Sequence, residues 1–286
     1  MRELIKKINI IRNKKVTKNT IWIMIERISQ MLISLIVGVI SARYLGPSNY
    51  GILNYGASLV TFFTAICKLG LENVIIKEYV ERRNENGKLL GTALIMRLIS
   101  SGLSIFAIFI IVYILNPNDN LIILVTMLQS IALIFQAYEL IDYWFQSNLN
   151  SKYVSIVKII AYVCVSIYKI ALLILKMPVQ WFAFSTTLDY IIITILMLFM
   201  YKKNNGQRLQ FSITEAKSLL KNSYHFIFSG LLVTLYTQMD KVMIGWYYTS
   251  QEVGLYSAAI TISTMWGFIP EALINSLIIV NSAMQI

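Results

Sequence analysis

The stretch Ser41–Ser58, SARYLGPSNYGILNYGAS, separates two long apolar runs and decides how the chain is organised. Its pair Gly46-Pro47 suits the boundary between two helices. Proline lacks the amide hydrogen that a helix interior needs, and glycine is the usual residue just past a helix end. Gly51 then opens the second apolar run. We therefore expect a tight turn here, joining two helices that run in opposite directions.

The composition of the whole chain indicates a membrane protein. Of its 286 residues, 57% are hydrophobic and only 14% are charged, and the mean hydropathy is +0.66. Soluble proteins carry about 25% charged residues. The apolar runs are long enough to cross a hydrocarbon core of about 30 Å. The sequence predicts an all-α polytopic membrane protein with about eight transmembrane helices, at residues 20–43, 52–76, 90–115, 121–145, 153–175, 179–201, 222–247 and 254–280.

The formal net charge of +11 is distributed unevenly over the predicted loops. If the N-terminus is cytoplasmic, most lysines and arginines outside the spans fall on the cytoplasmic side, and the outer side has only Lys176 and Arg43. This is the positive-inside pattern of multi-pass proteins. It predicts a cytoplasmic N-terminus, and it explains the basic excess as an orientation signal without nucleic acid as a partner.

A weak internal repeat relates two parts of the chain at an offset of 203 residues, pairing Tyr44 with Tyr247 and Gly51 with Gly254. The first and seventh spans run in the same direction, so the repeat is parallel, as in transporters that hold their substrate between two lobes. We expect a basic, interfacial cytoplasmic segment at 1–19, a six-helix N-terminal lobe at 20–201, a cytoplasmic linker at 202–221, and the first two helices of an incomplete, pseudo-symmetric C-terminal lobe at 222–286.

Charged residues inside the predicted spans are the candidate functional residues. A charge at mid-membrane costs roughly 2.5–3.5 kcal/mol and is retained where it faces a cavity or a partner. Lys158, Lys169 and Lys176 share one face of the fifth span, which favours a cationic stripe facing a cavity, with snorkelling of the end lysines as the alternative. The candidates for substrate binding are Arg27, Arg97, Lys158, Lys169 and Lys241, and the candidates for ion coupling are Glu26, Asp189 and Asp240.

Some of these charges also have a purely structural interpretation. The adjacent pairs Glu26-Arg27 and Asp240-Lys241 are equally consistent with ion pairs between helices, because neighbouring residues on a helix point in different directions. Glu139 and Asp142 are predicted to mark the inner end of the fourth span.

Three further features are predicted to be structural. Ser34, Gly38 and Ala42 form a ladder of small residues on the first span, which favours close packing of a neighbouring helix. Pro270 is expected to kink the eighth span, close to the charged Glu271. The two cysteines and the one histidine have no spacing that predicts a metal site or a disulfide.

Four segments resemble a known family of transporters. They are ARYLGPSNYG (Ala42–Gly51), KLGLENVIIKEY (Lys68–Tyr79), DYWFQSNLNSKY (Asp142–Tyr153) and DKVMIGWYYTSQEVGLYSAA (Asp240–Ala259). In this order and spacing the chain resembles the bacterial polysaccharide-biosynthesis flippases. These are the O-antigen and capsule repeat-unit translocases of the multidrug/oligosaccharidyl-lipid/polysaccharide exporter superfamily.

The resemblance implies a transporter with two six-helix lobes around a cationic cavity, and neither an enzyme nor a cofactor. Its implied substrate is an undecaprenyl-diphosphate-linked oligosaccharide, flipped across the bacterial cytoplasmic membrane for O-antigen, capsule or exopolysaccharide assembly. A polysaccharide polymerase and glycosyltransferases are the candidate partners. Because two full lobes need about four more helices, we expect the chain to be truncated at its C-terminus.

Three alternatives stay open. A multidrug exporter of the same superfamily would need an acidic or aromatic pocket, which the excess of intramembrane lysine disfavours. A membrane polymerase would need a large external loop, and a glycosyltransferase usually has a D-x-D metal site. The predicted outer loops are short, and no D-x-D occurs. A truncated chain is also consistent with a remnant that transports nothing.

Overall fold

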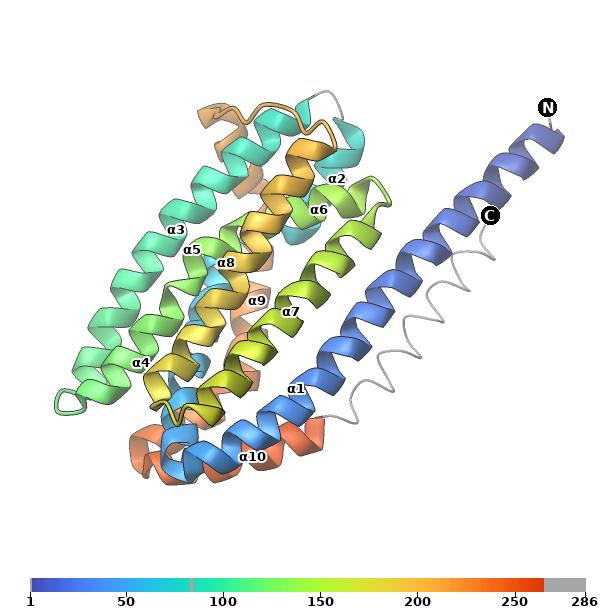
Figure 1. Ribbon diagram of the computed structural model, residues 1–286. Helices are drawn as coiled ribbons and strands as arrows, with labels where there is room; N and C mark the ends of the chain where they lie inside the picture. Colours follow the sequence, from blue (N-terminus) through green and yellow to red (C-terminus); the bar gives the residue numbers. More distant parts are fainter. Residues whose placement is uncertain (1, 83–84, 265–286) are drawn as a thin grey trace.

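The computed structural model describes residues 2–82 and 85–264 (Figure 1). These residues are almost entirely helical and include no strand. The elements are α1 (Arg2–Cys67), α2 (Leu71–Glu81), α3 (Asn86–Leu115), α4 (Asn120–Ser130), α5 (Ala132–Gln136), the short 3₁₀ helix η2 (Ala137–Glu139), α6 (Leu140–Ser147), α7 (Ser151–Ile174), α8 (Val179–Lys203), α9 (Ile213–Tyr247) and α10 (Ser250–Thr264).

Within the described residues, five segments are long and apolar enough to cross a membrane, which confirms an all-α polytopic membrane protein. They are Ile21–Cys67, Asn86–Leu115, Asn120–Ser147, Ser151–Ile174 and Val179–Lys203. The first contains two spans joined at a kink, so the five segments correspond to the six predicted spans of the N-terminal lobe. Helix α9 is not among them, and the part of the predicted eighth span that contains Pro270 and Glu271 lies outside the described residues.

Helix α1 changes direction at the turn that the sequence predicts. Gly46 has φ 70° and ψ 169°, a backbone conformation that glycine adopts because it has no Cβ to clash. Pro47 then begins the following helical stretch, where its missing amide hydrogen would have no helical partner anyway. The expected turn is present, but the second helical stretch begins at Pro47 and not at position 52.

The second predicted span, residues 52–76, is not one continuous helix. Helix α1 ends at Cys67, and Leu69 and Gly70 have φ angles of 53° and 61° before α2 begins at Leu71. Helix α2 then packs against α6 and α9. The prediction of a single helix is wrong here, because apolar residues continue through a break that the backbone makes at glycine.

Two apolar clusters fill the bundle, one toward each end. The cluster at the predicted inner end includes Leu71, Leu89 and Phe145, and the cluster at the predicted outer end includes Tyr55 and Phe182. Helix α3 also exposes a row of large apolar side chains. Such a face is costly in water and favourable in lipid, as expected for a membrane-spanning helix.

Helices α1 and α10 cross near the lower end of the bundle in Figure 1, and a glycine from each helix lies at the point of contact. A Cβ on Gly51 would lie 1.6 Å from the Ser250 carbonyl oxygen, and a Cβ on Gly254 would lie 2.0 Å from the Pro47 carbonyl oxygen. The offset of 203 that pairs Gly51 with Gly254 also pairs Pro47 with Ser250. The two contacts are therefore equivalent, which is what a two-fold axis through the crossing would produce.

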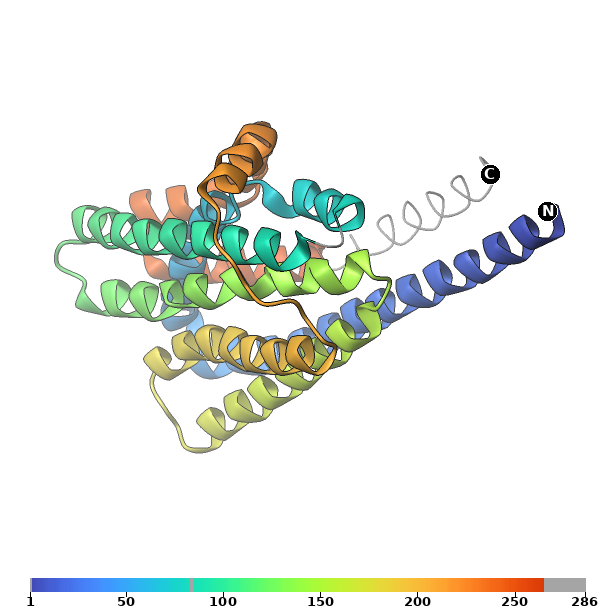
Figure 2. The same ribbon diagram turned by 90° about the horizontal axis from the view of Figure 1, so that it is seen from above.

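The first half of α1 runs along α7 and extends away from the other described helices toward the N-terminus (Figure 2). Helix α9 packs against α1, α2 and α3, on a different side of the bundle from α7. The first half of α1 contacts α7 through Glu26 and Lys158, while the stretch after Pro47 contacts α10 at Gly51 and α9 at Tyr55.

Replacing Gly51 with valine should destabilise the crossing of α1 and α10. The new side chain would have to displace the Ser250 carbonyl, and overpacking of this kind costs about 1–3 kcal/mol. We expect a lower unfolding temperature for the purified protein in detergent than for Gly102→Val, because a Cβ on Gly102 meets no heavy atom within 4 Å. Equal unfolding temperatures for the two variants would contradict this crossing.

Candidate functional site

A polar cavity of about 290 Å³ lies between α1, α7 and α8. Among the described residues, one base and one acid line it, Lys169 of α7 and Asp189 of α8. The other lining residues are mostly hydroxyl and amide side chains: Gln30, Ser34, Tyr162, Ser166, Ser185, Thr186 and Tyr190, with Val37, Gly38 and Val165. The cavity therefore offers hydrogen-bond donors and acceptors inside a bundle of apolar helices, as a site for a polar ligand requires.

Lys169 and Asp189 face this cavity without a close ion pair. No contact within 4.0 Å joins their charged groups in the described part of the chain, and Asp189 Oδ1 is buried without a hydrogen-bond partner. Lys169 and Lys158 are near enough to attract the carboxylate electrostatically. Asp189 Oδ1 is therefore available to accept a hydrogen bond.

Lys158 is adjacent to the cavity but is held by two acids. Its Nζ donates a hydrogen bond to Asp142 Oδ2 at 2.6 Å and lies 3.7 Å from Glu26 Oε1. Glu26 and Asp142 are only 8% and 4% exposed. Because these three residues come from α7, α1 and α6, we call this group the Lys158 clamp. Gln30 lines both the cavity and the narrow pocket beside the clamp, so the two are neighbours.

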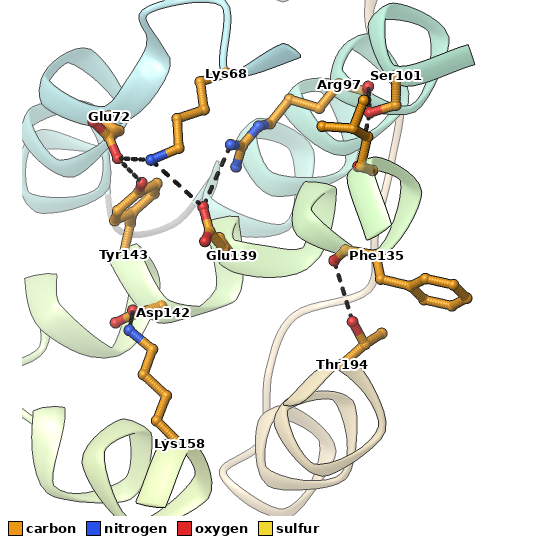
Figure 3. Close-up of polar contacts among 11 residues, drawn as sticks. Lys68, Glu72, Arg97, Ser101, Phe135, Glu139, Asp142, Tyr143, Lys158 and Thr194 are labelled. Atoms are coloured by element: carbon orange, nitrogen blue, oxygen red, sulfur yellow. Dashed lines mark hydrogen bonds and ion pairs between the residues drawn. The ribbon is translucent and has the colours of Figure 1, made fainter. Parts of the chain in front are cut away.

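A second group of charges joins α2, α3 and the η2–α6 segment (Figure 3). Arg97 is only 2% exposed, and its Nη2 lies 3.6 Å from Glu139 Oε2. Lys68 Nζ donates to Glu72 Oε1 at 2.8 Å and lies 3.9 Å from the same Glu139 oxygen. The Tyr143 hydroxyl also donates to Glu72. We call these five residues the inner cluster, and within it each base has an acidic partner.

The charges of the cavity, the clamp and the inner cluster nearly cancel. The bases are Lys68, Arg97, Lys158 and Lys169, and the acids are Glu26, Glu72, Glu139, Asp142 and Asp189. The lysine stripe predicted on the fifth span is therefore divided between three environments. Lys158 is compensated in the clamp, Lys169 faces the cavity, and Lys176 is exposed in the turn after α7.

The other predicted residues lie elsewhere. Arg27 is exposed on α1. The Tyr256 hydroxyl of α10 donates a hydrogen bond to Asp240 of α9, and Lys241 Nζ donates to Gln238 Oε1 at 3.4 Å. Asp240 therefore connects α9 to α10, and neither it nor Lys241 lines the polar cavity.

Glu139 and Asp142 are the acidic partners of Arg97 and Lys158, a pairing that was not predicted from the sequence. Their spacing of three residues is a usable signal, because it places both on one side of a helix. The hydroxyls of Ser166 and Ser185 were also missed. Single serines in apolar runs are common, so only the fold reveals that these two converge.

Comparison with protein-family models gives a match over residues 16–277, to the model described as polysaccharide biosynthesis protein. The chain belongs to this polysaccharide biosynthesis family. The resemblance carried by the four sequence segments is thereby confirmed. Comparisons with curated proteins and with solved structures gave no significant match. Together with the five apolar segments, the family indicates a multi-pass membrane protein of transporter type, with a role in polysaccharide biosynthesis or export.

Lys158→Met should destabilise the fold, because it leaves Asp142 and Glu26 buried without their cation. Breaking a buried ion pair costs about 3–5 kcal/mol, and we expect the lower end because the Lys158 side chain is 29% exposed. The free energy of unfolding in mixed detergent–SDS micelles measures the cost.

The matched control is Lys77→Met. The Lys77 side chain is 74% exposed, and its Nζ lies 3.8 Å from Glu81 Oε1. An exposed ion pair of this kind stabilises a protein by about 0.5 kcal/mol or less. If both lysine variants changed the free energy of unfolding equally, the clamp would not be a stabilising element.

Proposed function

We propose that this protein flips an undecaprenyl-diphosphate-linked oligosaccharide repeat unit across the cytoplasmic membrane, for O-antigen, capsule or exopolysaccharide assembly. The polar cavity with Lys169 and Asp189, enclosed by apolar helices, is the observation that carries the proposal. Family membership supports the polysaccharide context. The protein then acts as a transporter with a cytoplasmic N-terminus, while glycosyltransferases and a polymerase make and join the repeat units.

Lys169 is the residue proposed to contact the diphosphate. A diphosphate cannot enter the hydrocarbon core without replacing its hydration, and an ammonium group supplies charge-assisted hydrogen bonds for this purpose. Lys158 is less available, because Asp142 already accepts its hydrogen bond and Glu26 is close. Among the described residues, Lys169 has the one ammonium that lines the cavity, and it has no ion pair within 4.0 Å, so it is favoured over the stripe as a whole.

The hydroxyl and amide side chains of the cavity suit the sugar portion of the substrate. Sugar hydroxyls both donate and accept hydrogen bonds, and so does the amide of Gln30. The hydroxyls of Ser34 and Ser185 donate to the backbone carbonyls of Met31 and Phe182, so they can act as acceptors for a sugar. Asp189 adds a carboxylate oxygen without a hydrogen-bond partner, which can accept one more sugar hydroxyl. This mixture supports an oligosaccharide over a hydrophobic cationic drug, for which the lysine would be unfavourable.

The membrane potential would assist export of such a substrate. Moving one negative charge out of a negative interior gains about 2.3 kcal/mol per 100 mV. A diphosphate with two charges would gain roughly twice as much. The direction of this field favours net movement from the cytoplasmic to the outer leaflet.

Asp189 is the strongest of the three acids considered for ion coupling. Glu26 lies beside Lys158, and Asp240 accepts the hydrogen bond from Tyr256. Asp189 alone among these three faces the polar cavity and keeps an oxygen without a hydrogen-bond partner. A proton or cation taken up there would also weaken its attraction for Lys169, so the ammonium would be released toward the diphosphate.

The remaining basic residues, Arg97, Arg27 and Lys241, lie outside the polar cavity and have other roles. Arg97 neutralises Glu139 in the inner cluster and thereby holds α3 against the η2–α6 segment. Arg27 and Lys241 stay candidates for contacts with the substrate outside the cavity, on the exposed side of α1 and on α9.

Lys169→Ala should slow flipping of a fluorescent undecaprenyl-diphosphate-linked oligosaccharide in vesicles that contain the purified chain. Losing a hydrogen bond to a charged group costs about 1.5–3 kcal/mol, which corresponds to a roughly tenfold to hundredfold lower rate. Lys176→Ala is the control, because Lys176 shares the helical face but is exposed in a turn.

Equal rates for Lys169→Ala and the unaltered chain would remove the cavity from the transport path. If the unaltered chain flipped no lipid-linked oligosaccharide and its deletion sensitised cells to cationic drugs, the proposed substrate would be replaced by the multidrug alternative.

A further inference from the structure

The segment that joins α8 to α9, residues 206–212, lies across the first two turns of α3 (Figure 2). We call this segment the strap. A Cβ on Gly87 would lie 2.3 Å from the Arg208 carbonyl oxygen, and a Cβ on Gly91 would lie 2.4 Å from the Gln210 carbonyl oxygen. The spacing of four residues places both glycines on one face of α3. They let the backbone of the strap lie directly against the helix, because small residues permit close backbone approach.

Hydrogen bonds to α3 fix the direction in which the strap faces. Gln210 N donates to the Gly87 carbonyl at 3.2 Å, and Ser212 N donates to Thr92 Oγ1 at 3.1 Å. Ser212 has φ −144° and ψ 121°, which is extended backbone. Side chains of an extended segment alternate between two faces. Positions 209, 211 and 213 therefore share one face, and positions 208, 210 and 212 share the other.

The face with the odd-numbered residues is apolar and exposed. Leu209, Phe211 and Ile213 are 45%, 51% and 61% exposed. The opposite face carries the polar side chains of Arg208 and Gln210. Three neighbouring large apolar side chains are costly in water. Because the backbone is hydrogen-bonded to α3, the strap cannot rotate to bury them in the bundle.

The strap lies at the depth of the lipid headgroups. Helix α3 has 30 residues, which span about 45 Å at about 1.5 Å per residue. A bilayer with its headgroup regions is about 40–45 Å thick, and its hydrocarbon core is about 30 Å. Gly87 and Gly91 lie in the first two turns of α3, so the strap crosses it in the headgroup region on the predicted cytoplasmic side. Apolar side chains at this depth reach the acyl chains, as in interfacial segments.

Basic side chains accompany the apolar face. Lys202 and Lys203 are exposed in the last turn of α8, and Arg208 is exposed on the strap. The cytoplasmic leaflet contains anionic lipids that attract lysine and arginine near its surface. Both the charge and the depth of the strap therefore favour the leaflet over a soluble protein as the occupant of the apolar face.

We propose that the strap is an interfacial membrane anchor. Leu209, Phe211 and Ile213 insert into the cytoplasmic leaflet, while Arg208 contacts the phosphate of an anionic phospholipid. The segment predicted from the sequence as a cytoplasmic linker is thus a lipid-binding surface in its second half. The inference goes beyond the proposed function, because it does not depend on which molecule is transported.

The anchor would act on the start of α9, which follows the strap directly. Glu215, in the first turn of α9, accepts a hydrogen bond from Arg82 Nη1 at 3.1 Å and lies 3.9 Å from Lys88 Nζ. The N-terminal lobe holds the start of α9 through these contacts, and the leaflet holds it through the strap.

A spin-label scan of the full chain tests the anchor, in nanodiscs of phosphatidylcholine and phosphatidylglycerol. Nitroxides are attached to single cysteines at positions 208, 209, 210, 211 and 213, in a chain whose two native cysteines are changed to alanine. Collisions with oxygen report lipid, and collisions with a water-soluble nickel chelate report water. We expect the ratio of oxygen to nickel collisions to be several-fold higher at 209, 211 and 213 than at 208 and 210. A ratio that is equally low at all five positions would overturn the proposal and leave the apolar face to a soluble partner.

Gly91→Leu tests whether docking on α3 sets this alternation. Its side chain would displace the Gln210 carbonyl, so the difference between odd and even positions should disappear. Gly102→Leu is the matched control on the same helix, because a Cβ on Gly102 meets no heavy atom within 4 Å, and it should keep the alternation. Both variants remove a glycine from a helix, which raises helix propensity, and thermal unfolding confirms that each is folded. The same alternation in both variants would contradict the docked strap on which the proposal rests.

Lipid composition tests the contact of Arg208 with an anionic headgroup. For the label at position 211, the ratio of oxygen to nickel collisions should fall when phosphatidylglycerol is left out of the nanodiscs. With Arg208→Gln, the two lipid compositions should give the same ratio. A ratio independent of phosphatidylglycerol in the chain that keeps Arg208 would overturn this contact.

Discussion

The Lys158 clamp is the contact on which the arrangement of the polar cavity depends. A charge inside an apolar bundle has to be matched by the protein itself, because lipid offers no hydrogen bonds. Asp142 and Glu26 meet this requirement from two different helices, so α6 and α1 are held against α7. Helix α7 also packs on α8, and α1, α7 and α8 are the walls of the cavity. The ion pairs of Lys158 thus help to position the helices that surround Lys169.

The charges inside the lobe fall into two kinds with different consequences. In the clamp and the inner cluster, Lys158, Arg97 and Lys68 each have acidic partners, so these charges stabilise helix packing and attract a ligand weakly. In the cavity, Lys169 and Asp189 face the same space, and no ion pair within 4.0 Å joins them in the described part of the chain. A polar ligand can bind between them without breaking an ion pair of the fold. A cation-rich helix face therefore does not by itself make a cationic cavity.

The sequence predicted the features that depend on local chemistry. The helical class, the turn at Gly46-Pro47 and the family follow from composition, proline geometry and four segments. The break before Leu71 was missed because apolar residues run through it. The acid partners of Lys158 and the convergence of serines with Lys169 were missed for another reason. Periodicity shows which residues share a helix face, but it does not show which helix lies opposite.

Substrate protection of a cysteine in the cavity tests most directly whether the cavity holds the lipid-linked glycan. Ser166 lines the cavity beside Lys169 and can be replaced with cysteine in a chain whose Cys67 and Cys164 are changed to alanine. A water-soluble maleimide should label this cysteine. Undecaprenyl-diphosphate-linked oligosaccharide should block the labelling, whereas undecaprenol should not. Labelling that stays the same at lipid-linked oligosaccharide concentrations that saturate flipping would contradict the account.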